Sequence, residues 1–408
     1  MEKREYKVYG YRWIMLAVYM IVVLSNQLMW ITFAPITGTA AGFYAVSDFR
    51  IGLLSMSFML VYILISIPAS WLIDQYGIRV AVGLGALFTG GFGMMRGLVS
   101  SDYTLVLIAQ IGIATGQPFI LNAITKIAAR WFPIDERATA SGLGTLAMYV
   151  GILLGMAVTP YITIQYGMEK MLLIYGIISA ITSVVFFIFV RERPVTPPCQ
   201  PGMEERSLVL DGLRQILRQR EFLWLMLIFF IGLGVFNGVT TWIEDIVRPR
   251  GFTATQAGLV GGLMILGGVI GALILPPLSD HFRRRIPFIM LSLAGAILGL
   301  TGITFAPAYW LLLSSAFIMG FFLLSAGPIG FQYGAELAFP APEGTSNGLL
   351  LLMGQISGIV FIIGMDSFKS NTGSMTRSLL GLIALMTVSL ILCVNLNESS
   401  ILTVNNPE

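Results

Sequence analysis

The stretch PASWLIDQYGIR runs from Pro68 to Arg79, at the junction of two long apolar runs, residues 51–72 and 79–99. A bilayer core of about 30 Å needs about 20 apolar residues in one helix. Each run has this length, and the charged turn between them is short. The stretch therefore predicts two membrane-spanning helices that are joined by a tight polar loop.

Apolar runs with polar breaks recur along all 408 residues, of which 56% are hydrophobic and 11% are charged. A soluble domain has about 25% charged residues, so the composition predicts an all-α membrane protein embedded in a lipid bilayer. The pattern predicts twelve transmembrane helices, near residues 13–38, 51–72, 79–99, 104–125, 138–162, 171–190, 222–243, 255–278, 286–306, 309–333, 344–367 and 377–396.

Lysine and arginine are unevenly distributed over the loops between these spans. If the amino terminus is cytoplasmic, most of the 24 Lys and Arg residues fall on the cytoplasmic side. Short cytoplasmic loops accumulate such residues. We therefore expect both termini in the cytoplasm, with the chain in a plasma membrane or a bacterial inner membrane.

A second charged stretch, PPLSDHFRRR at residues 276–285, follows the eighth span as the first stretch follows the second span. Its Asp280 lies 206 residues after Asp74, which is about half the chain. This spacing predicts two homologous halves, and hence two pseudo-symmetric six-helix bundles.

The longest polar stretch divides six spans from six and is rich in proline and charge. We expect an amino-terminal bundle at residues 1–190, a cytoplasmic linker at 191–221 and a carboxy-terminal bundle at 222–408. Within the linker, residues 207–219 fit either a short amphipathic surface helix or a solvated chain.

This arrangement resembles the major facilitator superfamily, whose loop signature reads Gly-x-x-x-Asp-Arg-x-Gly-Arg-Lys. The first loop matches it at Asp74, Gly77 and Arg79 and departs from it at Ser70 and Gln75. The resemblance implies a major facilitator fold with charged gates, although ordinary loops that follow the positive-inside rule are the alternative. The expected gating residues are Asp74, Gly77, Arg79, Arg130, Glu136, Arg137, Asp280, Arg284 and Arg285.

Several amides and a tryptophan lie inside the apolar spans. Polar side chains are costly in hydrocarbon unless they face a partner or a water-filled cavity. The alternative for each is an interhelical hydrogen bond that contributes about 0.6 to 2 kcal/mol. The candidate substrate-binding residues are Asn26, Trp30, Gln117, Asn237, Gln332 and Gln355.

The stretches NQLMWI, GQPFIL and GFQYGAELAFPAPEGTSNGLLLLMGQISGI resemble the feline leukaemia virus subgroup C receptor family. Members of that family are associated with choline, ethanolamine and haem. The resemblance implies that Trp30, Gln117 and Gln355 line the substrate pocket, and that Asn237 stands where the family has an aromatic residue. Independently, the π face of a tryptophan attracts a quaternary ammonium by about 0.5 to 2 kcal/mol.

The sequence argues against most other functions. Two cysteines far apart and a single histidine cannot form the Cys/His cluster of a zinc or iron–sulfur site, so we expect neither a metal site nor a cofactor. No nucleotide-binding loop and no paired catalytic carboxylates lie within the spans, so neither an ATP-driven pump nor an enzyme is expected. The formal net charge of +3 gives no reason to expect nucleic acid.

We therefore expect a monomeric transporter that moves a small organic solute by alternating access. No Asp, Glu or His lies near the middle of any expected span, which favours facilitative or potential-driven uptake of a small cation such as choline or ethanolamine. Haem or a small organic acid is the alternative cargo, and a non-transporting receptor is the alternative of another class. Arg96 and Lys126 would suit an acid, although a structural, snorkelling role near the span ends is the expectation for both.

Overall fold

The structure is a computed structural model that describes residues 7–133, 136–196, 198, 216–338, 343–369 and 373–398. Helices make up nearly all of these residues, and no strand occurs among them, as the predicted all-α fold requires. Most of the predicted linker, including the proposed surface helix at 207–219, lies outside the described residues. Pro342, within the stretch GFQYGAELAFPAPEGTSNGLLLLMGQISGI, also lies outside them.

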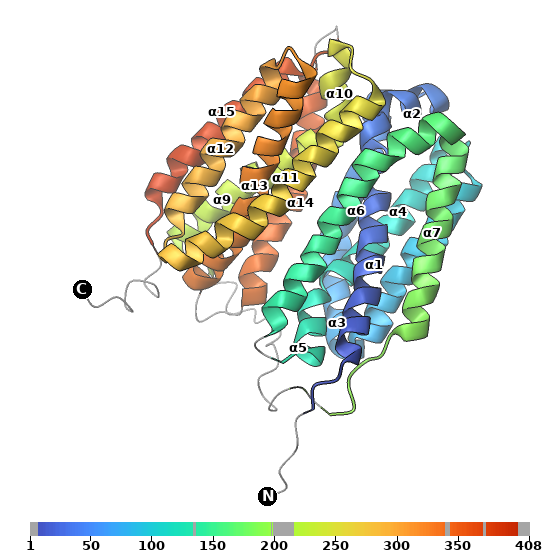
Figure 1. Ribbon diagram of the computed structural model, residues 1–408, viewed down its shortest axis with the longest axis vertical. Helices are drawn as coiled ribbons and strands as arrows, with labels where there is room; N and C mark the ends of the chain where they lie inside the picture. Colours follow the sequence, from blue (N-terminus) through green and yellow to red (C-terminus); the bar gives the residue numbers. More distant parts are fainter. Residues whose placement is uncertain are drawn as a thin grey trace, which may run out of the picture. The chain divides into compact units, whose positions relative to one another are not determined.

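Two sets of helices follow one another along the chain (Figure 1). The first set is α1 (Tyr11–Ile31), η1 (Ala34–Ile36), α2 (Thr37–Tyr44), α3 (Asp48–Leu98), α4 (Tyr103–Leu121), α5 (Ile124–Trp131), α6 (Arg137–Tyr166) and α7 (Met168–Phe189). The second set is α9 (Arg220–Thr241), α10 (Ile243–Val247), η3 (Arg248–Arg250), α11 (Ala254–Phe282), α12 (Ile286–Phe305), α13 (Tyr309–Ala338), α14 (Glu343–Ser367), α15 (Thr376–Leu392) and η4 (Cys393–Asn395).

Eleven helical segments in the described part of the chain are long and apolar enough to cross a membrane. One of them, α3, has 51 residues and would be about 75 Å long if straight. Its two ends nevertheless lie close together, because the Tyr103 hydroxyl, just after α3, donates to the Arg50 carbonyl near its start (2.7 Å). Helix α3 therefore folds back at Gly77, whose φ is 86°, and comprises two of the twelve predicted spans.

The first span, predicted at 13–38, lies within the apolar helical segment Tyr11–Tyr44 but is interrupted. Helix α1 ends at Ile31, and a short 3-10 helix follows at Ala34–Ile36. Pro35 has no backbone N–H to donate to the carbonyl of Ile31, so the regular helical hydrogen-bond pattern is broken there. Because the whole segment is apolar, its composition alone did not indicate this interruption.

The chain divides into two compact units. The first comprises residues 1–33 and 39–206, and the second comprises residues 34–38 and 207–408. The predicted boundaries at residues 190 and 221 stay predictions, since the chain between the two units lies mostly outside the described residues.

Three structural features recur in the second unit at the same offset of 206 residues. These are a side-chain cap at a helix start, a tyrosine hydroxyl bonded to a backbone carbonyl, and a turn residue with positive φ. The corresponding pairs are Ser47 and Thr253, Tyr103 and Tyr309, and Gly77 and Arg283. The internal repeat predicted from the two aspartates is therefore present in the structure.

Close packing of α6 against α1 holds the first span in place. A side chain at Gly151 on α6 would collide with the backbone carbonyl of Leu24 on α1, so only glycine permits this approach. Small residues at such contacts let transmembrane helices pack through their backbones. The packing places the carboxyl half of α1, where Asn26 and Trp30 lie, inside the first unit.

Candidate functional site

Trp30 lies in the last turn of α1 and is 6% exposed. Its indole Nε1 donates a hydrogen bond to the carbonyl of Ser55 on α3 (3.2 Å). The polar edge of the indole is therefore already bonded to protein. A ligand of Trp30 would therefore contact the π face of the ring, which suits a cation or an apolar group.

Asn26, one turn earlier on α1, is fully buried. Its Nδ2 donates to Thr89 Oγ1 (3.0 Å) and to the Ile113 carbonyl (3.4 Å). These bonds join three spans of the first unit. The geometry matches the interhelical alternative, and a substrate-binding role for Asn26 stays a prediction that its contacts do not favour.

Gln117 and Gln355 differ from Asn26 in having no hydrogen-bond partner for their side-chain amides among the described residues. Gln117 lies on α4 and is 5% exposed, whereas Gln355 lies on α14 and is half-buried. Neither amide is among the fully enclosed side-chain atoms that lack a partner, so both reach accessible space. Each amide is consequently available to a solute or to water.

Asn237 and Gln332, the other two candidates, are bonded within the second unit. Asn237 on α9 donates from Nδ2 to the carbonyl of Gly354 (3.1 Å), the residue before Gln355. Gln332 on α13 is exposed and donates to Glu336 (3.2 Å). Asn237 thus positions the backbone beside Gln355, and Gln332 belongs to a charged cluster near the α11–α12 loop.

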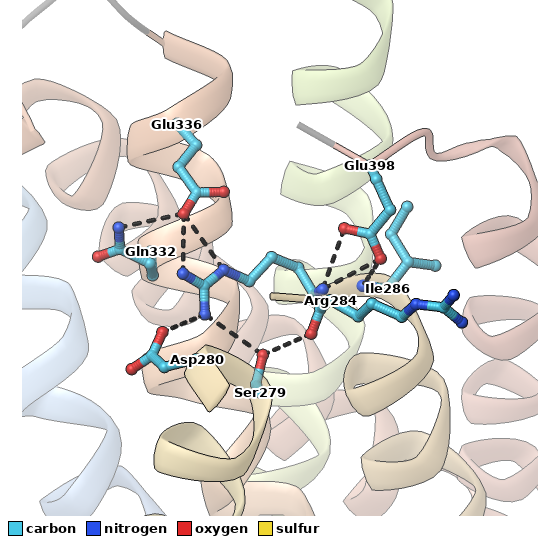
Figure 2. A network of polar contacts seen from close by, with 8 residues as sticks. Ser279, Asp280, Arg284, Ile286, Gln332, Glu336 and Glu398 are labelled. Atoms are coloured by element: carbon cyan, nitrogen blue, oxygen red, sulfur yellow. Dashed lines mark hydrogen bonds and ion pairs between the residues drawn. The ribbon is translucent and has the colours of Figure 1, made fainter. Parts of the chain in front are cut away.

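Figure 2 shows this charged cluster, which we call the Glu398 cluster. The Glu398 carboxylate accepts hydrogen bonds from the backbone N–H groups of Arg285 (3.0 Å) and Ile286 (3.1 Å) at the start of α12. The Arg285 guanidinium pairs with Asp280 and with Glu336 (2.9 Å). Burial lowers the pKa of Arg285, but hydrogen bonds to Asp280 and Glu336 outweigh this effect and raise the pKa above its ordinary value.

Arg284 lies beside this cluster without joining its ion pairs. Its backbone carbonyl accepts from the Ser279 hydroxyl (2.6 Å), while its exposed side chain points away from Asp280 and Glu336 (Figure 2). Of the three gating residues predicted here, Asp280 and Arg285 are brought together.

The first unit has a related arrangement, the Glu192 cluster, at the turn within α3. The Glu192 carboxylate accepts from the backbone N–H groups of Ile78 (3.1 Å) and Arg79 (2.7 Å) and pairs with Arg130. A side chain at Gly77 would collide with this carboxylate. The positive φ therefore requires glycine there, and a side chain would also displace the carboxylate.

The remaining predicted gating residues of the first unit make other polar contacts. Asp74 pairs with Lys126 (2.9 Å), so the Lys126 ammonium joins α5 to the end of the first half of α3, which agrees with the structural role expected for it. Glu136 pairs with Arg12 (2.9 Å), and Arg137 donates to the carbonyl of Ala129 (3.0 Å). The gating role of these residues stays a prediction.

Sequence reasoning missed Glu192 and Glu398, the carboxylates that cap the two turns. They are 206 residues apart, the offset already known from Asp74 and Asp280. Extending that offset beyond the loops to the ends of the sixth and twelfth spans would have identified both residues.

A family model described as Major Facilitator Superfamily matches residues 15–362. The chain belongs to the major facilitator superfamily. It is accordingly a multi-pass membrane protein of a transporter family, as the loop signature indicated.

Among solved structures, it is similar to a bacterial homologue of the human lysosomal transporter Spinster in an inward-facing, unoccupied conformation. That likeness has a TM-score of 0.71 and 15% identity over 98% of this chain and 97% of the other, and it shows the fold alone.

Curated relatives match most of the chain at higher identity than the Spinster homologue does. Solute carrier family 49 member A3 of Danio rerio is 30% identical over 91% of this chain and 81% of its own length. The choline/ethanolamine transporter FLVCR2 of Homo sapiens is 26% identical over 90% and 74%, respectively. An uncharacterized MFS-type transporter, C09D4.1 of Caenorhabditis elegans, is 29% identical over 96% and 70%.

Proposed function

We propose that this transporter carries a small polar cation such as choline or ethanolamine, and that Trp30, Gln117 and Gln355 contact the solute. The observation that carries the proposal is the pair of amides at Gln117 and Gln355, which have no partner among the described residues. The amides of Asn26 and Asn237, in contrast, are bonded to protein. The named activity of the FLVCR2 relative supports the same solute class.

The chemistry of the three residues fits an amino alcohol. The indole face of Trp30 attracts an ammonium or trimethylammonium group, with a contribution of about 0.5 to 2 kcal/mol. The amides can donate to and accept from a hydroxyl group. None of the three residues is charged, so the solute would keep its own charge during transport.

We further propose that uptake is driven by the membrane potential, with both termini in the cytoplasm. A monovalent cation gains about 2.3 kcal/mol per 100 mV on moving inward. The middle of the spans holds no Asp, Glu or His for proton coupling. The Glu192 and Glu398 clusters would then stabilise the loops that close the cytoplasmic side in one state.

Uptake of radiolabelled choline into proteoliposomes tests the driving force. A potassium diffusion potential, negative inside, should accelerate uptake, and an imposed pH gradient without a potential should not. Uphill accumulation under the pH gradient alone would contradict the proposal. Haem and a small dicarboxylate serve as competitor solutes, and inhibition by either at concentrations below that of choline would assign the alternative cargo.

A further inference from the structure

The carboxyl end of α1 is buried within the first unit, although helix ends leave carbonyl groups without intrahelical partners. The helix ends at Ile31, and Pro35 cannot donate to the freed carbonyls. In an apolar interior these groups need other donors. Trp30 lies in this last turn, so the donors also determine how its backbone is held.

The carbonyl of Met29 receives side-chain donors from three elements. Arg96 Nη1 on α3 lies 3.1 Å from it, Gln110 Nε2 on α4 lies 3.3 Å from it, and the Thr32 hydroxyl lies 3.2 Å from it. Gln110 also accepts a hydrogen bond from Arg96 (2.7 Å). The end of α1 is thus fastened to the third and fourth spans.

Arg96 contacts α1 and its continuation on both sides of Trp30. Besides the Met29 carbonyl, it reaches the Met29 Sδ atom (2.7 Å) and the Thr32 hydroxyl (3.4 Å), and its guanidinium lies 5.6 Å from the centre of the Phe33 ring. The residue is 0% exposed, so its role is structural as expected, but the expected snorkelling is wrong. The cost of burying the charge is partly offset by the negative end of the α1 dipole.

The repeat supplies an internal control for this arrangement. An offset of 206 residues places Gly302 at the position of Arg96 and Ala316 at that of Gln110. The same offset places Asn237 at the position of Ile31, and there α9 continues as a helix to Thr241. The second half therefore forms the same spans without an arginine at the equivalent position, so the fold does not require one there.

We propose that Arg96, together with Gln110, is a positioning residue that holds Trp30 in the geometry that binds the solute. The identity of the solute in this proposal rests on the proposed function, whereas the positioning of Trp30 by Arg96 does not. It accounts for a buried cation whose described partners include no acid and whose Nε has no hydrogen-bond partner among the described residues.

Fluorine NMR of protein labelled with 5-fluorotryptophan tests the positioning without any ligand. The chain has seven tryptophans, and the resonance that is lost in Trp30→Phe identifies Trp30. Arg96→Met should shift or broaden this resonance. Arg250→Met is the matched control, since Arg250 also fastens a helix end, through the carbonyls of Ile303 (2.6 Å) and Thr304 (3.0 Å) of α12. It should leave the Trp30 resonance in place, and an unchanged resonance in Arg96→Met would overturn the proposal.

Equilibrium binding of radiolabelled choline tests the consequence for the solute. Arg96→Met should raise Kd about tenfold, Arg96→Lys should raise it less because the ammonium can still donate to the Met29 carbonyl, and Arg250→Met should leave Kd within twofold. An unchanged Kd in Arg96→Met would overturn the proposal even if its melting temperature fell. If Arg96→Met does not fold, Arg96→Lys and Gln110→Leu take its place in both assays.

The two experiments distinguish failure of the proposed solute from failure of the positioning role. Absence of choline binding in the wild type would refute the proposed solute, and the fluorine resonance would then decide the positioning role alone.

Discussion

Removing the Glu398 carboxylate should loosen the start of α12 measurably. Its oxygens accept from the backbone N–H groups of Arg285 (3.0 Å) and Ile286 (3.1 Å), which have no intrahelical partner at a helix start. Capping interactions contribute about 0.5 to 2 kcal/mol, and hydrogen bonds to a charged group about 1.5 to 3 kcal/mol. For two such bonds to a half-buried carboxylate we expect Glu398→Ala to cost about 2 kcal/mol, and Glu398→Gln, which keeps one acceptor, about 1 kcal/mol.

Thermal unfolding of the purified protein in detergent measures this cost. For a unit of this size, 2 kcal/mol corresponds to a fall in melting temperature of about 4 to 8 °C. Glu169→Ala is the control, because Glu169 is an exposed acid in the first turn of α7 that makes no hydrogen bond in the described part of the chain. It should lose only a dipole interaction of about 0.3 to 1 kcal/mol. Equal melting temperatures for Glu398→Ala and Glu169→Ala would refute the reasoning.

Three further substitutions test the local geometry. Gly77→Ala should destabilise the protein by about 1 to 3 kcal/mol because φ is 86° and the new methyl group meets Glu192; an unchanged melting temperature would show that the turn is not restrained. Asn26→Leu should lower the melting temperature while leaving the choline Kd within twofold, because its amide is bonded to Thr89 and Ile113; a large rise in Kd at constant stability would restore it as a binding residue. Gly151→Val should lower the yield of folded protein by separating α6 from α1, whereas the control Gly142→Val, where a side chain meets open space, should not.

The sequence predicted the spans and the repeat because both depend on local composition. Twenty apolar residues must cross a membrane as a helix, and one aspartate in each half was enough to find the 206-residue offset. Gly77 was also predictable, because Asp74 and Arg79 beside it match the same loop signature.

The roles of individual polar residues could not be predicted in this way. Asn26 and Gln117 have similar amides in similar apolar surroundings, yet one is bonded to Thr89 and the other has no partner among the described residues. That difference depends on which helix faces which, and the sequence of a single span does not contain it. Arg96 was misjudged for the same reason, because its burial follows from the interruption of α1 at a distant point in the chain.

Equilibrium binding of radiolabelled choline to the Trp30→Ala, Gln117→Ala and Gln355→Ala variants tests the central claim most directly. Trp310→Ala and Gln75→Ala, which change exposed residues of the same types, are the matched controls. We expect each of the three site variants to raise Kd about tenfold or more at an unchanged melting temperature, and the controls to bind as the wild type does. Wild-type affinity in all three site variants would contradict the account.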